Sequence, residues 1–161
     1  MVNPTHELIL IVVSEAQVVF LLERMVKSLG YEVKVYQDRA SVMKMLPNLN
    51  PALVLLGETL PDGPGLNLAS EIIRRFPAVP IIQFVARETP EALKAAMRLG
   101  ITEYLSLPLR AEDLNQAIKN SMDLARARKE AELLESRRAT AGAPYPLGEF
   151  GTPSRPGGTA A

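Results

Sequence analysis

Few side chains in this sequence are of the types that carry out chemistry, and they are not grouped. His6 is the only histidine, and there is no cysteine. A histidine catalyst needs an acidic or nucleophilic partner, and none accompanies His6, which we interpret as a solvated residue. Without cysteine there is no thiol nucleophile, thiolate metal site or disulfide framework. The absence of cysteine also fits a cytoplasmic protein.

The other candidates are Ser14, Glu15, Glu58 and Asp62, which follow two apolar runs. Ser14 has no adjacent base and is predicted to be the N-cap of a helix. We expect Glu58 to point to the other side of its strand end, and Asp62 to bond backbone amides within a turn. These residues form no acid–base pair, nucleophile–base pair or metal-ligand set. The sequence therefore predicts no catalytic residue, no cofactor-binding residue, no metal ligand and no enzymatic activity.

Strands and helices that alternate five times must position these residues. The apolar runs predict strands at 8–13, 33–36, 53–56, 80–85 and 104–105. The first and third are β-branched or leucine-rich without alternation, as in strands buried on both faces of a parallel sheet. Amphipathic segments between them predict helices, whose ends are marked by Gly30, Pro47, Pro77 and Gly100. The pattern predicts an α/β fold, a flavodoxin-like doubly wound five-stranded parallel sheet of order 2-1-3-4-5. Residues 61–65 are predicted to be a turn.

The last predicted helix begins near Ala111 and continues further than the sheet requires. Four apolar residues extend a narrow seam through this extension: Leu124, Ala127, Ala131 and Leu134. Such a seam fits a solvated helical overhang, a linker or a dimeric coiled coil. We therefore divide the chain into a domain at 6–125, a helical extension at 126–138 and a tail at 139–161. The tail is rich in proline and glycine and is predicted to be disordered, as a linker or as residues left by a cloning vector.

Charge and hydropathy exclude two classes of partner. Lysine plus arginine and aspartate plus glutamate each number 18, giving a net charge of zero. No basic patch stands out, so we expect no nucleic-acid binding. The apolar run at 8–13 is too short to span a bilayer and lacks the flanks of a signal peptide, so we expect no membrane association.

Three segments resemble bacterial response-regulator receiver domains: LPDGPGL at 60–66, PII at 80–82 and GITEYLSLP at 100–108. The resemblance covers about residues 6–125. It implies the doubly wound fold and a place in two-component (phosphorelay) signalling. Members of this family normally transfer a phosphoryl group from a kinase histidine to their own aspartate.

The resemblance also implies where that chemistry would lie. The family uses an acidic pair and an aspartate to hold Mg²⁺, the aspartate being the nucleophile, with a hydroxyl residue and a lysine contacting the phosphoryl group. The five corresponding positions here are Val13, Ser14, Gly57, Val85 and Leu107. None has the required side chain.

Tyr104 matches the family's switch aromatic. We interpret it as a half-buried tyrosine with a solvated hydroxyl, and the alternative is a repurposed switch that contacts partners.

The leading hypothesis is a non-phosphorylatable pseudo-receiver that acts by protein–protein contact. Its partner would be a signalling kinase, a regulator or an output domain, bound on the face of the fourth helix, fifth strand and fifth helix. One alternative is a small-molecule sensor that uses an emptied, mostly apolar pocket at positions 13, 14, 57, 85 and 107. These side chains could instead collapse together and stabilise the core. The other alternative is a scaffold that dimerises through the last helix or through the same face.

Overall fold

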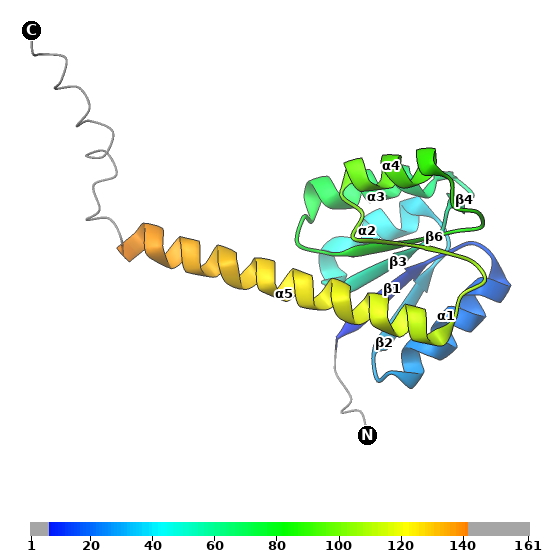
Figure 1. Ribbon diagram of the computed structural model, residues 1–161, viewed down its shortest axis with the longest axis horizontal. Coiled ribbons are helices and arrows are strands. Elements are labelled where there is room, and N and C mark those ends of the chain that lie inside the picture. Colours follow the sequence, from blue (N-terminus) through cyan, green and yellow to red (C-terminus); the bar gives the residue numbers. More distant parts are fainter. Residues whose placement is uncertain (1–6, 142–161) are drawn as a thin grey trace, which may run out of the picture. The chain divides into compact units, whose positions relative to one another are not determined.

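Five parallel strands form the central sheet of this computed structural model, which describes residues 7–141 (Figure 1). They are β1 (Leu8–Val12), β2 (Glu32–Tyr36), β3 (Leu53–Leu56), β6 (Ile81–Val85) and β7 (Glu103–Ser106). Their order in the sheet is β2-β1-β3-β6-β7. This confirms the predicted order, because two short strands outside the sheet, β4 (Thr59–Leu60) and β5 (Gly63–Pro64), take the intervening numbers.

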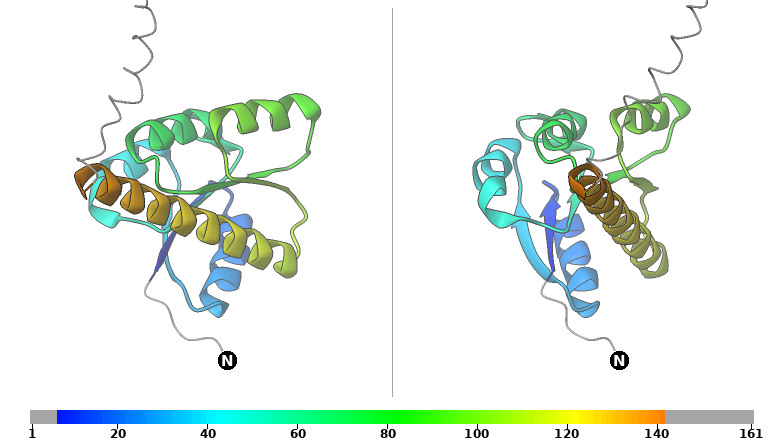
Figure 2. Two further views of the ribbon diagram at one scale, coloured as in Figure 1. Left: turned by 60° about the vertical axis from the view of Figure 1, so that its left-hand side comes forward. Right: turned by 90° about the vertical axis from the view of Figure 1, so that its left-hand side faces the viewer.

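Helices cover both faces of the sheet (Figures 1 and 2). They are α1 (Ala16–Ser28), α2 (Arg39–Leu49), α3 (Gly65–Arg75), α4 (Pro90–Leu99) and α5 (Ala111–Ala141). Buried residues of α1 and α5 pack with one set of strand residues, which includes Ile9, Ile11 and Leu55. Helices α2, α3 and α4 pack with the alternate set, which includes Leu10 and Val54. This division follows from the pleat, which sends successive side chains to opposite faces.

The start of α1 corrects one prediction. The residue that precedes the helix is Glu15, and it makes no side-chain cap bond. The Ser14 hydroxyl instead donates to the carbonyl of Thr59 at 3.2 Å. The prediction of Ser14 as N-cap was wrong because its hydroxyl is hydrogen-bonded to Thr59, which is remote in sequence, and not to an amide of the helix.

The end of α2 corrects another. The helix continues through Pro47 to Leu49, and Asn50 follows in the left-handed conformation with a φ of 47°. A proline in the last turn removes one intrahelical hydrogen bond without preventing the final residues from closing the helix. The predicted stop at Pro47 was therefore two residues early.

The predicted turn at 61–65 is shorter than expected. Residues Thr59–Leu60 (β4) and Gly63–Pro64 (β5) pair as a small antiparallel ladder, which leaves Pro61 and Asp62 at its tip. Helix α3 begins at once with Gly65.

Helix α5 is long, as predicted. The chain divides after Ala125 into units of residues 1–125 and 126–161, and the helix continues from the first into the second. The helix ends at Ala141 rather than Arg138, so the first residues of the predicted tail are helical. Alanine favours a helix, and no glycine or proline lies between Arg138 and Gly142. Residues 142–161 of the predicted tail, and His6, lie outside the described part of the chain. No helix within that part is long and apolar enough to cross a membrane.

Candidate functional site

The carboxyl ends of β1, β3, β6 and β7 lie at one edge of the sheet, where this fold places its chemistry. Val13 follows β1 and is 1% exposed, and Val85 ends β6 and is 2% exposed. Val13 packs into the cluster between the sheet and helices α1 and α5, against which Leu107 also packs. Three of the five positions are therefore occupied by apolar side chains that contribute to packing.

Gly57 directly follows β3 at the centre of this edge. Its amide donates to the carbonyl of Val12 at 2.9 Å. A Cβ atom added at Gly57 would meet its nearest neighbours, backbone and side-chain atoms of residues 12 and 13, at 3.6 Å. That is ordinary van der Waals distance, so packing does not require glycine here.

The residues at this edge do not fit Mg²⁺. Positions 13, 14 and 57 carry no carboxylate, and hard divalent cations need oxygen ligands, chiefly from carboxylates. Within residues 7–141, no three His, Asp or Glu side chains are grouped to hold a metal ion.

A cleft of about 320 Å³ lies beside the edge, lined by Ser14, Glu15, Glu58, Thr59, Leu60 and Pro61. Its lining is mixed, with the carboxylates of Glu15 and Glu58 beside the apolar Leu60 and Pro61. Of the five residues of the apolar pocket proposed from the sequence, only Ser14 lines this cleft, and Val13 and Val85 are buried in the core. Collapse of these side chains, the alternative to a sensing pocket, describes this edge better.

Glu58 reaches across the edge from β3 to β6. Its carboxylate Oε1 accepts a hydrogen bond from the backbone amide of Ala86 at 3.1 Å. The prediction that it points to the other side of the strand end was wrong, because sequence spacing does not show a partner in the next connection along the sheet.

Tyr104, on β7, packs against the cluster between the sheet and helices α2, α3 and α4. The residue is half-buried, but its hydroxyl is buried and has no hydrogen-bond partner within the described residues. Burial raises the pKa of Tyr104, and the nearby negative charges of Glu58 and Glu88 raise it further. The expectation of a solvated hydroxyl was therefore wrong: the ring is directed inward.

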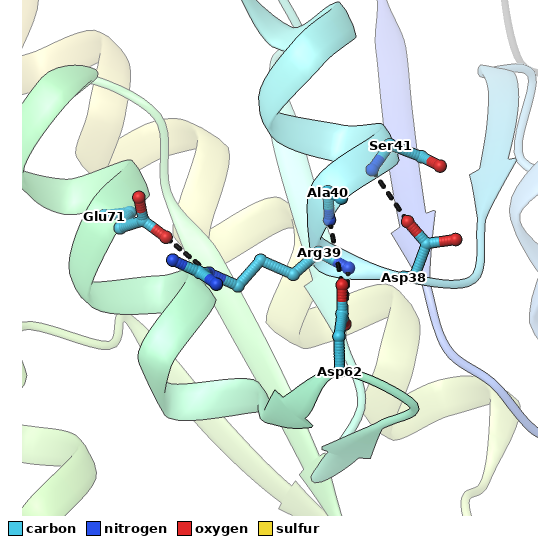
Figure 3. Close-up of polar contacts among 6 residues, drawn as sticks. All are labelled: Asp38, Arg39, Ala40, Ser41, Asp62 and Glu71. Carbon is cyan, nitrogen blue, oxygen red and sulfur yellow. Dashed lines mark hydrogen bonds and ion pairs between the residues drawn. The ribbon is translucent and has the colours of Figure 1, made fainter.

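Asp62 joins the turn between β4 and β5 to the start of α2 (Figure 3). Its two carboxylate oxygens accept from the backbone amides of Arg39 and Ala40, at 2.9 and 3.1 Å. The hydrogen bond from the Arg39 amide is the largest of the effects that lower the pKa of Asp62. Asp62 thus bonds backbone amides, as predicted, but those of a different element. An anion at a helix N-terminus is favourable because the first amides have no partner within the helix.

Two further contacts complete this arrangement. The Asp38 carboxylate caps α2 by accepting from the amide of Ser41 at 2.7 Å. The Arg39 guanidinium donates to the Glu71 carboxylate on α3. The loop after Gly57 is therefore bound to α2 through Asp62, and α2 is bound to α3 through the Arg39–Glu71 ion pair (Figure 3). The sequence gives no signal for these contacts, because the residues are remote from one another along the chain.

Comparison with known proteins identifies the family of this chain. The model for the response regulator receiver domain matches residues 9–119. The chain belongs to the response regulator receiver domain family. Such receiver domains serve two-component response regulators, and they interact with kinases and output domains.

Curated relatives are longer than this receiver domain. It is 32% identical over 97 residues to the transcriptional regulatory protein DpiA of Escherichia coli strain K12, covering 60% of this chain and 40% of that protein. It is 27% identical over 129 residues to the response regulator protein TmoT of Ectopseudomonas mendocina, covering 80% of this chain and 58% of that protein. The chain thus spans less than two thirds of the length of either relative.

Solved structures agree on the fold. The CheY-like receiver domain protein from Methanospirillum hungatei JF-1 matches 77% of this chain and 99% of its own, with a TM-score of 0.72 and 22% identity. NtrX from Brucella abortus matches 83% of this chain and 31% of its own, with a TM-score of 0.77 and 23% identity. At such identities the likeness establishes the fold.

Proposed function

We propose that this receiver domain is not phosphorylated and acts by contact with a protein partner. The observation that carries the proposal is Gly57, which leaves the end of β3 without a nucleophile. Ser14, the one hydroxyl among the five positions, is engaged with the Thr59 carbonyl. No carboxylate, hydroxyl or amine at these positions is left to hold a metal ion or a phosphoryl group.

The test is incubation of the chain with acetyl phosphate and Mg²⁺, followed by intact-mass spectrometry. We expect no mass increase in the native chain or in a Gly57→Asp variant, because a nucleophile alone lacks the metal site and the phosphoryl contacts. A positive control restores all five side chains together: Val13→Asp, Ser14→Asp, Gly57→Asp, Val85→Thr and Leu107→Lys. We expect this variant to gain one phosphoryl group.

Two outcomes would overturn the proposal. A phosphoryl group gained by the native chain would show that another residue accepts it. Failure of the five-fold variant, once folded, would show that these are not the positions where the family's chemistry belongs.

The partner surface of this proposal is the face formed by α4, β7 and α5. Met97 on α4 is 48% exposed, and the inward Tyr104 lies beneath the same region on β7. A signalling kinase, a regulator or an output domain is the partner, and the cytoplasm is the location that the lack of cysteine favours.

A second candidate function is dimerisation through the extension of α5. Leu124 and Leu134, which lie on the seam, are 42% and 59% exposed. Burial of these leucines against a second copy would stabilise the pairing.

A further inference from the structure

The end of β3 and the connection between β6 and α4 are joined by one charged hydrogen bond. The Glu58 carboxylate accepts from the Ala86 amide at 3.1 Å. A bond from a neutral amide to a carboxylate is stronger than one between neutral groups. The main chain of Glu58 is itself held, because its carbonyl accepts from the amide of Gly65 at 2.9 Å. The carboxylate is therefore presented from a fixed backbone.

Ala86 is the first residue after β6, at the point where the hydrogen-bonded ladder between β6 and β7 ends. Val85, the last residue of β6, accepts from the amide of Leu107 at 2.9 Å. Helix α4 then starts at Pro90, and the Thr89 side chain caps it by accepting from the amide of Ala92 at 3.1 Å. A bond at Ala86 thus fixes the short connection on which the start of α4 depends.

The substituted positions leave Glu58 free to make this bond. Position 57 has no side chain, position 85 has no hydroxyl and position 107 has no amine. Glu58 also has no ion pair within the described residues. Neither a cation nor a neighbouring donor therefore draws the carboxylate away from Ala86.

Tyr104 lies in the same neighbourhood. Its hydroxyl is buried and near enough to Glu58 and Glu88 for their charges to act on it. We propose that Glu58 is a positioning residue, a permanent latch that holds the β6–α4 connection and the inward Tyr104 in one arrangement without any added group. The latch deepens the proposed function, because it keeps the α4–β7 face in a constant form for a partner.

Nuclear magnetic resonance of the isotopically labelled full chain tests the latch without a partner or a phosphoryl donor. The variants are Glu58→Ala and Glu58→Gln, and the matched control is Glu88→Gln, which removes a second charge near Tyr104. We expect the Ala86 amide to exchange with solvent about tenfold to a hundredfold faster in Glu58→Ala than in the native chain. Glu58→Gln should be intermediate, because a neutral oxygen still accepts, and Glu88→Gln should match the native chain.

In Glu58→Ala the ring resonances of Tyr104 and the amide resonances of residues 86, 91 and 92 should shift. Glu88→Gln lies within this connection, so its sequence neighbours and, through the lost charge, the Tyr104 ring should change. The amide resonances of residues 86, 91 and 92 should stay in place in that control. Equal Ala86 exchange in the native chain and Glu58→Ala would overturn the latch. Equal acceleration in Glu88→Gln would do so as well, since it would reduce the effect to general charge. Circular dichroism confirms that each variant is folded. Phosphorylation of the native chain would refute the proposed function and leave this result unchanged, so the two failures are distinguishable.

Discussion

Gly57 and Gly65 are glycines for different physical reasons. A Cβ atom at Gly57 would find ordinary contacts at 3.6 Å, whereas one at Gly65 would lie 2.1 Å from the carbonyl oxygen of Gly57. Packing does not require the first glycine, whereas the second permits a close approach of two backbone segments. We expect Gly57→Ala to change the free energy of unfolding by less than about 1 kcal/mol.

We expect Gly65→Ala to lower the free energy of unfolding by about 3 kcal/mol, because backbone must move to admit the methyl group. Urea unfolding of both variants followed by circular dichroism measures the two effects. Equal stabilities for Gly57→Ala and Gly65→Ala would contradict this account of the β3–α3 loop.

A second prediction at the residue scale concerns Asp62, whose contribution to the stability of the fold should depend on pH. Its hydrogen bonds to the amides of Arg39 and Ala40 lower the pKa of the folded-state carboxyl. A carboxyl whose folded-state pKa is depressed stabilises the fold above its unfolded pKa, and this contribution is lost as the pH falls through the folded-state pKa. We therefore expect Asp62→Asn to be less stable than the native chain at neutral pH, with the difference shrinking below about pH 4.

The measurement is the urea midpoint of both proteins across the acid range. Glu135→Gln, which changes an exposed carboxylate on α5, is the control and should follow the native curve. A difference between Asp62→Asn and the native chain that stayed constant with pH would contradict the assigned role.

At the scale of elements, the hydrophobic pattern of the sequence was sufficient to predict the strands of the sheet. It was insufficient to predict the contacts made by the segments that connect them. The runs at Leu8–Val12 and Leu53–Leu56 are buried strands as predicted, because an unbroken apolar run has few other stable places. The start of α1, the bond of Glu58 and the identity of the amides that Asp62 accepts from were missed. Each depends on a partner in another loop, and such a contact leaves no local periodicity in the sequence. The substituted positions were identified through the family resemblance, whereas the bond that Glu58 makes beside them required coordinates.

A further prediction concerns helix α5, because side chains are buried in its first part and exposed in its extension. Ile118 is fully buried in the cluster beneath the helix, whereas Leu133 is 54% exposed. We expect Ile118→Ala to lower the free energy of unfolding by about 2–5 kcal/mol through lost burial and a cavity. Leu133→Ala should change it by less than about 0.5 kcal/mol. Chemical denaturation of the two variants gives the comparison, and similar losses would mean that the extension contributes to the stability of the domain.

At the scale of the whole molecule, the extension of α5 determines the expected oligomeric state. Residues 126–138 are all exposed in the single chain, although Leu124 and Leu134 lie on one seam with Ala127 and Ala131. Pairing this seam with a second copy would bury apolar surface that water otherwise contacts. We therefore expect the full chain to dimerise and a chain ending at Ala125 to be monomeric by light scattering.

Two substitutions distinguish dimerisation through the seam from a general effect of hydrophobic residues in the extension. Leu134→Glu, on the seam, should shift the full chain toward monomer because it places like charges at the centre of the pairing. Leu133→Glu introduces the same charge beside the seam and should leave the mass of the dimer unchanged, since side chains adjacent in a helix face different directions. Equal, monomeric masses for the full chain and the chain ending at Ala125 would rule out the scaffold. The protein-contact function would then depend on the α4–β7–α5 face alone, with Glu58 holding that face in place.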